Sequence, residues 1–427
     1  MSDVDLTALN GNFKERYASK IKDLVPMQNW LIKNIPNVDK RVKMLGNLYH
    51  QPVKLSSGQG YTYNSDGTAF TFNTPRALKL DDAQVEGFEL VRSDVISFNA
   101  ISRSDNKDKA FSKAVDLTID DMVTGMSSRL EVTLLHGRNG IGIADDSTNV
   151  DATHTSVVLT AASWAGGIWA RNINAQVQFF NGTTIVSSGA DSVFVVEEVD
   201  SATYTLIVSG TSTGISALDT ALNSADQTIY FYGARTSAGA DVEGVGLMKI
   251  ANNSGTLFNI NAAGAGNSLW LGNSYSAASG PLTFSKLQKA ITLPVDKGLD
   301  QDVTVLVSTA SWADLVTDQA AARRYGDIRS KKMDNGAEVL EFLSSNGSME
   351  IVPHPMVKRG EAVIVPLDSL SRVGSTDITF NMPGTDENMF LRVAGKAGYE
   401  AVVYSDNTLF CDTPSQTCYV SGIVPNA

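Results

Sequence analysis

The sequence contains four histidines, the side chain that most often binds metal ions and moves protons near neutral pH. No two of His50, His136, His154 and His354 lie four residues apart, so there is no helical zinc-binding pair. The sequence also has no Walker phosphate loop and no G-x-G-x-x-G turn after a strand. We therefore expect a protein that is not an enzyme and that has no catalytic residue, cofactor or metal ion.

Carboxylates are the other groups with the chemistry for catalysis. Asp120-Asp121 and Glu197-Glu198 are adjacent acidic pairs, and such pairs are typical of the solvated surface of an acidic protein. A hydrolase that uses two carboxylates is the alternative, because such groups meet only in the folded chain and sequence spacing does not reveal them.

The only two cysteines, Cys411 and Cys418, exclude a disulfide-rich secreted scaffold. They bracket a turn-rich stretch at residues 412–417. We expect two free thiols in a C-terminal hairpin. A disulfide across that hairpin is the alternative in an oxidising environment.

A basic cluster runs against the net charge of −12. It lies between an expected helix and the next strand and consists of Arg323, Arg324, Arg329, Lys331 and Lys332. The cluster fits either a solvated loop or an electrostatic contact with an acidic neighbour or a polyanion.

The length of 427 residues is enough for about two to three domains with a large core. Apolar residues make up 43% and charged residues 19%, which indicates a folded chain. The 46 acidic residues outnumber the 34 basic ones, which argues against a protein built mainly to grip nucleic acid. Residues 1–20 hold no apolar signal segment and no window is apolar enough for a membrane helix, so we expect neither export nor membrane insertion.

The N-terminal part of the chain predicts an arm followed by a ribbon. Phe13, Tyr17, Ile21 and Leu24 form one apolar helix face in an arm of residues 1–50. Next, strands at residues 61–63 and 69–72 flank an Asp-Gly turn signal, which predicts a hairpin. Few large aliphatic residues fall in this ribbon, so we expect it to pack on something other than itself.

A strand at residues 86–102 is followed by a helical pattern at residues 104–136, about 50 Å long at 1.5 Å per residue. We interpret this helix as a spine along which other elements lie. Its apolar stripe consists of Phe111, Val115, Ile119, Met122, Met126 and Leu130.

Residues 155–234 predict an inserted module of five short strands, forming a small antiparallel barrel or sandwich. We expect this module to have its own core, which includes Val177, Phe179, Val195 and Ile207. The rest of the chain predicts a mixed α+β core. Its expected helices are residues 284–291 and 311–325, and its expected strands are residues 303–307, 339–342, 349–352, 362–365, 390–393, 400–404, 408–411 and 418–423.

This order of elements resembles the major capsid proteins of tailed bacteriophages, which have the Hong Kong 97-type shell fold. The arm, the ribbon, the spine helix, the strings at residues 255–260 and 349–355 and the final strand at residues 419–423 carry the likeness. We expect an α+β fold with six parts, of which the resemblance implies five, while the inserted module at residues 155–234 departs from the family plan. These are an N-terminal arm (1–50), an extended hairpin loop (51–80), a peripheral domain with the spine helix (81–145), an inserted all-β module (155–234), an axial domain (244–375) and C-terminal strands that return to the peripheral domain (376–427).

The resemblance further implies a virion protein, assembled in the host cytoplasm, that forms pentamers and hexamers around double-stranded DNA without reading its sequence. Scaffolding, portal and decoration proteins are the other expected partners. The expected intersubunit contacts are Lys54, Tyr61, Tyr63 and the basic cluster. The family's Lys–Asn crosslink is not implied, because no partner for Lys54 can be matched. Two other hypotheses stay open: a β-rich adhesin or carbohydrate-active protein, and a cellular nanocompartment shell.

Overall fold

The computed structural model describes residues 29–38, 44–45, 48–64, 69–99, 114–318, 331–332, 338–344, 347–380, 390–392 and 397–426. The expected arm helix around Phe13 and Tyr17 lies outside the described residues, as do Arg323, Arg324 and Arg329.

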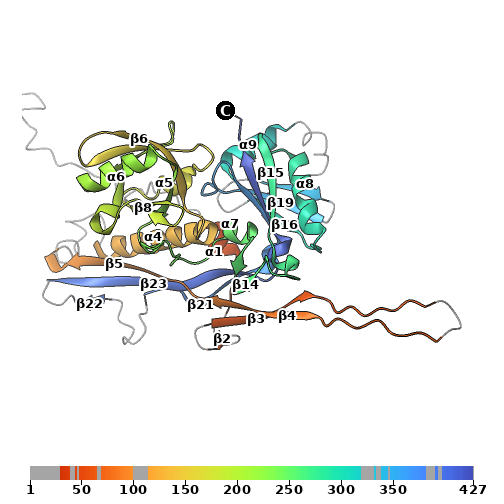
Figure 1. The fold of residues 1–427 in the computed structure, drawn as a ribbon. Helices are drawn as coiled ribbons and strands as arrows, with labels where there is room; N and C mark the ends of the chain where they lie inside the picture. Colours follow the sequence, from red (N-terminus) through yellow and green to blue (C-terminus); the bar gives the residue numbers. More distant parts are fainter. Residues whose placement is uncertain are drawn as a thin grey trace, which may run out of the picture.

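A long helix, α4 (Ala114–His136), lies along one face of a mixed sheet at the centre of the molecule (Figure 1). Met122 and Met126 of the helix pack against Ala401 and Val403 of the sheet. The burial of Met122, Met126 and Leu130 confirms the predicted apolar face, and the predicted end at His136 is also confirmed. The strands of the sheet are β1 (Asn37–Val38), β21 (Leu370–Thr379), β23 (Gly398–Cys411), β22 (Phe390–Arg392) and β5 (Glu89–Ser97).

The strand β23 is one continuous element, where two separate strands were predicted at residues 400–404 and 408–411. It stays extended through the polar residues between them because it pairs with β5 on one side and with β21 on the other. Both neighbours supply backbone hydrogen-bond partners, which makes the low strand propensity of Asp406 and Asn407 unimportant.

The inserted module is a closed antiparallel barrel with a helix attached (Figure 1). Its strands follow the order β10–β11–β7–β6–β12–β8, and β8 also pairs with β10, which closes the ring. Helix α6 (Ser212–Leu222) begins at the N-cap Thr211, whose hydroxyl accepts a hydrogen bond from the Gly214 amide. The strands are β6 (Gly142–Asn149), β7 (His154–Leu159), β8 (Gln176–Asn181), β9 (Thr184–Ile185), β10 (Phe194–Asp200), β11 (Thr205–Ser209) and β12 (Gln227–Phe231).

The module differs from its prediction in extent and in register. It begins at β6 and not at residue 155, and α6 means that it is not all-β. Val177 and Phe179 are buried as predicted, but Val195 and Ile207 are only partly buried. Their neighbours fill the core instead, because a shift of one residue along a strand exchanges its two faces. These core neighbours are Phe194, Val196, Leu206 and Val208.

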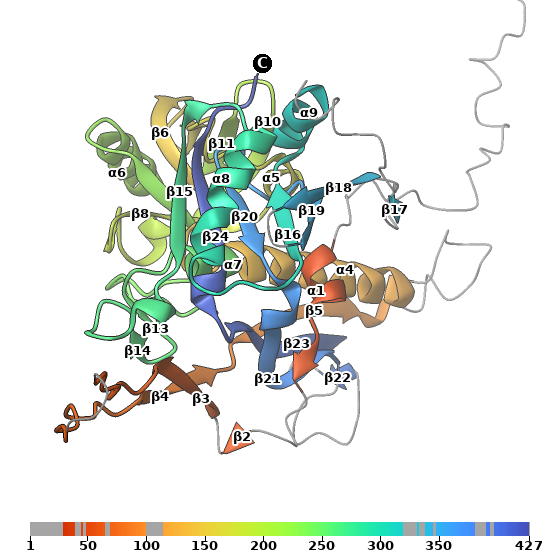
Figure 2. The same cartoon turned by 90° about the vertical axis from the view of Figure 1, so that its right-hand side faces the viewer.

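A second large sheet forms the other half of the molecule, with α8 (Phe284–Val295) and α9 (Thr309–Thr317) beside it (Figure 2). The apolar run Val303–Val307 forms the buried central strand β16, as predicted. The sheet order is β15 (Asn273–Gly280), β24 (Cys418–Ile423), β20 (Ala362–Val365), β16, β19 (Gly347–Pro353), β18 (Glu338–Ser344) and β17 (Lys331–Lys332).

Two predictions about this half are wrong. Strand β24 was expected in the peripheral sheet, but it pairs with β20 and β15 in this second sheet, where Cys418, Val420 and Ile423 are buried. The helix predicted at residues 311–325 ends at Thr317, because Asp318 has an extended backbone.

The positions of the two cysteines follow from the placement of β23 and β24 in different sheets. Cys411 ends β23 and Cys418 begins β24, so the two do not share a hairpin. Both are free thiols, as the preferred prediction held. Both are buried, and burial raises the pKa of each thiol to about 12, so neither is a reactive thiolate.

The ribbon extends from the lower edge of the body in Figure 1, next to β14, which is one of several short elements of the fold. Its base is the hairpin of β3 (Leu48–Ser56) and β4 (Lys79–Glu86). The ladder therefore extends past the expected boundary at residue 80. The short elements are α1 (Trp30–Asn34), β2 (Met44–Leu45), α5 (Gly166–Trp169), α7 (Leu247–Ala251), β13 (Thr256–Leu257), β14 (Ile260–Asn261) and the 3-10 turns Gly189–Ser192, Ser268–Trp270, Leu367–Ser369 and Pro414–Gln416.

No helix in the described ranges combines the length and the apolar character that a membrane crossing requires.

Candidate intersubunit surface

The base of the ribbon is anchored in the body by apolar and polar contacts. The ring of Tyr49 meets that of Phe410 edge to face at 5.4 Å, and Leu55 is buried. Lys79 donates a hydrogen bond to the carbonyl oxygen of Ala265 at 2.9 Å. The base therefore has a fixed direction relative to the body.

The outer half of the ribbon, described at residues 57–64 and 69–78, extends away from the body (Figure 1). Its two sides meet through the backbone pair Gln59 and Arg76. Farther out, the Asn73 amide donates to the Thr62 hydroxyl at 2.8 Å, and its side chain donates to the Tyr61 carbonyl at 2.9 Å. The strands predicted at residues 61–63 and 69–72 are therefore extended segments without a regular ladder.

Four aromatic side chains project from this outer half into solvent. Tyr61 is 73% exposed, Tyr63 94%, Phe70 50% and Phe72 79%. Burying a side chain of this kind is worth about 1.5–3 kcal/mol. In the monomer these four side chains stay in water, so this stabilisation is not gained. An exposed apolar patch of this kind marks a protein interaction surface. The ribbon is therefore the leading candidate for an intersubunit contact.

The predicted contact residues fall on two separate parts of the molecule. Lys54, Tyr61 and Tyr63 are all exposed on the ribbon. Lys331 and Lys332 form β17, the last strand of the second large sheet, and pair with β18. The contact role of all five stays a prediction.

The sequence-based set omitted Phe70 and Phe72, although both had been placed in the ribbon. The signal that identifies them is the alternation of aromatic and small residues on both sides of the turn, because every second side chain of an extended segment shares a face. Phe70 and Phe72 also contact each other edge to face, with ring centroids 5.5 Å apart.

A buried carboxylate holds the first described helix onto the spine helix. Glu131 of α4 accepts hydrogen bonds from the Leu31 amide at 2.7 Å and from the Ile32 amide at 3.1 Å. Its Oε1 also lies 3.1 Å from Nε2 of His354, and both side chains are buried. Glu131 thereby joins α1, α4 and the turn after β19. A five-residue helix is not stable alone, so this carboxylate is a main anchor of the segment.

The remaining histidines have separate structural partners. His50 lies 2.6 Å from Asp82 at the ribbon base, and this hydrogen bond lowers the pKa of Asp82. His154 lies 2.8 Å from Asp151 on the barrel surface, and that hydrogen bond raises the pKa of His154. His136 is fully buried, which lowers its pKa well below its ordinary value. Within the described ranges, no three His, Cys, Asp or Glu side chains gather in a way that could hold a metal ion.

One sequence pattern was missed. Residues 210–214 read Gly-Thr-Ser-Thr-Gly and fit the G-x-S-x-G pattern of a nucleophile elbow. An elbow holds its serine in a strained turn, but Ser212 is the first residue of α6 and has no positive φ. His154 contacts Asp151, Thr153 and Glu197, and not this serine. The pattern is therefore the start of a capped helix.

No protein-family model matches the chain, and no curated protein matches it. Solved structures match it along nearly their whole length. The capsid asymmetric unit of cyanophage A-1(L) has a TM-score of 0.54 and 11% identity and covers 98% of each chain. An encapsulin complex from Synechococcus elongatus has a TM-score of 0.47 and 9% identity, covering 99% of this chain and 96% of that one. A Mycobacterium phage Cain structure has a TM-score of 0.48 and 10% identity, covering 100% and 99%.

The cyanophage match shows that the chain has the fold of a phage capsid protein. The predicted α+β shell fold of the Hong Kong 97 type is thereby confirmed.

Proposed function

We propose that the chain is the major subunit of a closed protein shell and is a structural protein, not an enzyme. The observation that carries this proposal is the capsid fold, matched over 98% of both chains. The exposed ribbon supports it, because a shell subunit needs a surface that is completed only by its neighbours.

In this proposal, the outer half of the ribbon lies on a neighbouring copy of the chain. Each aromatic side chain contributes about 1.5–3 kcal/mol when it becomes buried, and rotational symmetry repeats that contribution in every subunit. Heterologous contacts that close around rotation axes give pentamers and hexamers, and these build an icosahedral head.

The proposed content of the shell is double-stranded DNA held without sequence readout, in a virion assembled in the host cytoplasm. The net charge of −12 keeps the free subunit soluble and weakens early condensation on nucleic acid. Scaffolding, portal and decoration proteins are proposed partners. The basic cluster at residues 323–332 is a further proposed contact, either with a neighbour's carboxylates or with the packaged polyanion.

The test is the state of assembly. The full chain is expressed, separated by size-exclusion chromatography and viewed by negative-stain microscopy, alone and with the other head proteins of its source. Closed particles in the megadalton range support the proposal, and a monomer or a trimer under both conditions contradicts it.

A cellular nanocompartment shell would also form closed particles, so the content of the particles decides between the two. Nuclease-protected double-stranded DNA supports a virion, and an enzyme cargo without DNA supports a nanocompartment. An adhesin or carbohydrate-active protein would form neither kind of particle.

A further inference from the structure

The turn between β19 and β20, at residues 354–361, is a joint where three parts of the molecule meet. On the side of the second sheet, the His354 amide donates a hydrogen bond to the Val307 carbonyl of β16 at 2.8 Å. On the side of the barrel, the Gly360 amide donates to the Ala162 carbonyl at 2.7 Å. The third side of the joint faces the C-terminal end of the spine helix.

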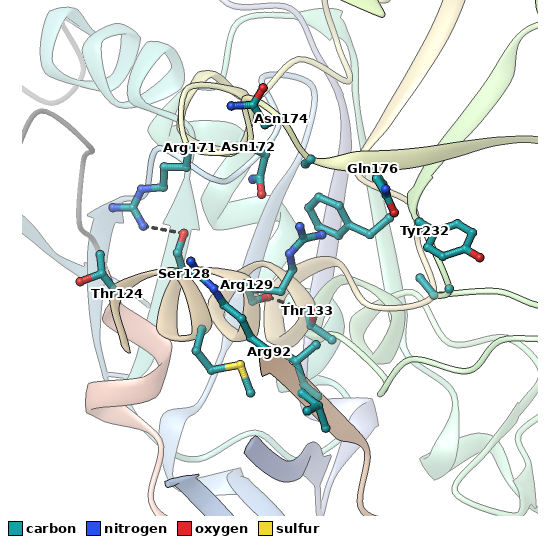
Figure 3. Close-up of a pocket in the computed structure, with 18 of the residues that line it drawn as sticks. Arg92, Thr124, Ser128, Arg129, Thr133, Arg171, Asn172, Asn174, Gln176 and Tyr232 are labelled. Carbon is teal, nitrogen blue, oxygen red and sulfur yellow. Dashed lines mark hydrogen bonds between the residues drawn. The ribbon is translucent and has the colours of Figure 1, made fainter. Parts of the chain in front are cut away.

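Farther along the spine helix, a cleft of about 1200 Å³ separates the helix from the barrel (Figure 3). Residues of α4 and β5 line one side of the cleft, and residues 171–176 and 231–234 line the other. Arg171 crosses it with a hydrogen bond to the Ser128 hydroxyl at 3.0 Å. Because this stretch of the interface is not closely packed, the joint has a larger share in holding the barrel in place.

Met356, in the middle of the joint, uses both of its backbone groups on histidine rings. Its carbonyl oxygen lies 2.8 Å from Nε2 of His136, the last residue of α4, and a carbonyl only accepts, so this nitrogen carries the hydrogen. The Met356 amide donates to Nδ1 of His354 at 3.2 Å. The hydrogen of His354 is therefore on Nε2, which donates to Glu131 at 3.1 Å. The closed joint thus holds both rings as one neutral tautomer.

The two rings differ in what a second proton would meet. His354 faces the carboxylate of Glu131, so a positive charge on this ring has a partner. Nδ1 of His136 is buried, and among the described residues it has no hydrogen-bond partner. Burial, and then the charge of Lys358, hold the pKa of His136 well below its ordinary value of 6.5. His136 is therefore the ring that stays neutral only while the joint is closed.

In the described part of the chain, the carboxylates near the joint are engaged elsewhere. Glu131 accepts from two α1 amides and from the other histidine. Glu361 lies 3.8 Å from Nζ of Lys358, and its charge also acts on the Tyr419 hydroxyl of β24. The charges that act on His136 are those of Lys358 and His354, and both oppose its protonation. The other charged side chains of the joint, the end of α4 and the neighbouring α7 are Arg359, which donates to the Tyr204 hydroxyl, Arg138, whose amide donates to Glu243, and the exposed Lys249.

We propose that the joint is an acid-sensitive contact, in which protonation of His136 moves residues 354–361 away from the end of the spine helix. In the closed joint, protonated His136 would have a buried N–H without an acceptor and a positive charge near Lys358, whereas an open joint exposes the ring to water. The closed form is therefore fully favoured above about pH 6.5 and loses stability as the pH falls below that value. This inference does not depend on the proposed shell function.

Hydrogen exchange of residues 354–361 in the unassembled full chain tests the proposal, after correction for the chemical pH dependence of amide exchange. Between about pH 7.5 and 5.5 the open population should rise about tenfold, because the exposed ring of the open form binds a proton with the ordinary pKa of 6.5. The amides of β16 report global unfolding. No rise in the parent, or exchange of the joint at the same rate as β16 at every pH, overturns the proposal.

His136→Gln is the decisive variant, because the glutamine amide keeps an N–H donor for the Met356 carbonyl and takes up no proton in this range. Its open population should change less than about twofold over the same pH range. The matched control is His154→Gln, which removes a histidine on the barrel surface and should keep the tenfold rise of the parent. A rise in His136→Gln as large as that in the parent overturns the proposal.

A second measurement on the parent covers the case in which His136→Gln does not fold, which circular dichroism would show. The imidazole nitrogens of histidine-labelled protein are followed by NMR over the same pH range, and the His136 signal is assigned through its contact with labelled Met356. In the closed form, His136 should stay neutral at a pH where His154, whose pKa is raised by its hydrogen bond to Asp151, has already gained its proton. Protonation of both rings at the same pH overturns the proposal.

Discussion

The barrel and the ribbon are both antiparallel β-structures that stand out from the centre of the molecule. They differ in the burial of their aromatic residues, which are enclosed in the barrel and exposed on the ribbon. In the barrel, β8 pairs with β10, the ring of strands closes, and Phe179 and Phe194 meet in its core at 5.2 Å. In the ribbon, the regular ladder stops at Ser56 and Lys79, and Phe72 remains 79% exposed. A module that closes on itself buries its own apolar surface, whereas an open ribbon leaves that surface for a partner.

Replacing one buried and one exposed phenylalanine with alanine tests this contrast, and it should give the largest difference in the free energy of unfolding. Phe179→Ala leaves a cavity in the barrel core and should lower the free energy of unfolding by about 3–5 kcal/mol. Phe72→Ala, its matched control on the ribbon, should change it by less than about 0.5 kcal/mol. Urea denaturation of the isolated subunit measures both. Equal losses would remove the distinction between the two regions.

The α1 segment is an intermediate case, since it is too short to be stable alone but has its partner within the same chain. Glu131→Gln replaces one acceptor oxygen with an N–H₂ group that faces a backbone amide. We expect a loss of about 2–3 kcal/mol in the free energy of unfolding, because a buried donor is left unsatisfied. The exposed Glu198→Gln is the control. A loss in Glu131→Gln no larger than in the control would show that α1 is held by other contacts.

The junction between barrel and spine helix should make the stability depend on pH. Burial raises the pKa of Glu243 from 4.5 to about 7, so the folded state favours the protonated form. This contribution is complete below pH 4.5 and is lost as the pH rises through about 7. Glu243→Gln should remove about 3 kcal/mol of the decline in the free energy of unfolding between pH 4.5 and about 7. Parallel stability curves for the parent and the variant would contradict the assignment.

The ribbon variants should have the smallest effect on the subunit and a large effect on assembly. Tyr63→Ser combined with Phe72→Ser removes exposed apolar surface and should change the free energy of unfolding by less than about 0.5 kcal/mol. The yield of closed particles in sedimentation should fall sharply, because each lost side chain forgoes about 1.5–3 kcal/mol at every copy of the contact. Normal yields would mean that these two rings do not reach a neighbour.

Local patterns in the sequence predict the elements that have a strong apolar signal. The run Val303–Val307 identifies β16 because it is buried on both faces. By contrast, the one large apolar residue of β6, Ile143, is exposed, and the buried side of the strand includes the small residues Gly142 and Ala144, so its pattern resembles a loop. The sequence-based prediction of which residues of β10 and β11 face the core was wrong for a related reason. Apolar residues occur on both faces of these strands, and only the closed barrel determines which face is inside.

Contacts between distant parts of the chain leave no trace in local patterns. Strand β24 reads as a typical strand, but its place beside β20 depends on the path of the whole chain. The contact between the Arg129 guanidinium and the Phe231 ring joins residues about 100 positions apart, so sequence spacing does not predict it. The ribbon was predictable, because its turn signal and its lack of aliphatic residues both lie within residues 51–74.

Hydrogen exchange of the ribbon backbone before and after assembly tests the central claim most directly. In its described residues, 57–64 and 69–78, the outer half of the ribbon has one isolated backbone bridge, so these amides should exchange rapidly in the isolated subunit. Contact with a neighbour should protect them in assembled particles, while the amides of β16 and of the barrel stay protected in both states. Equal exchange of residues 57–78 in both states would contradict the account of the ribbon as the intersubunit contact.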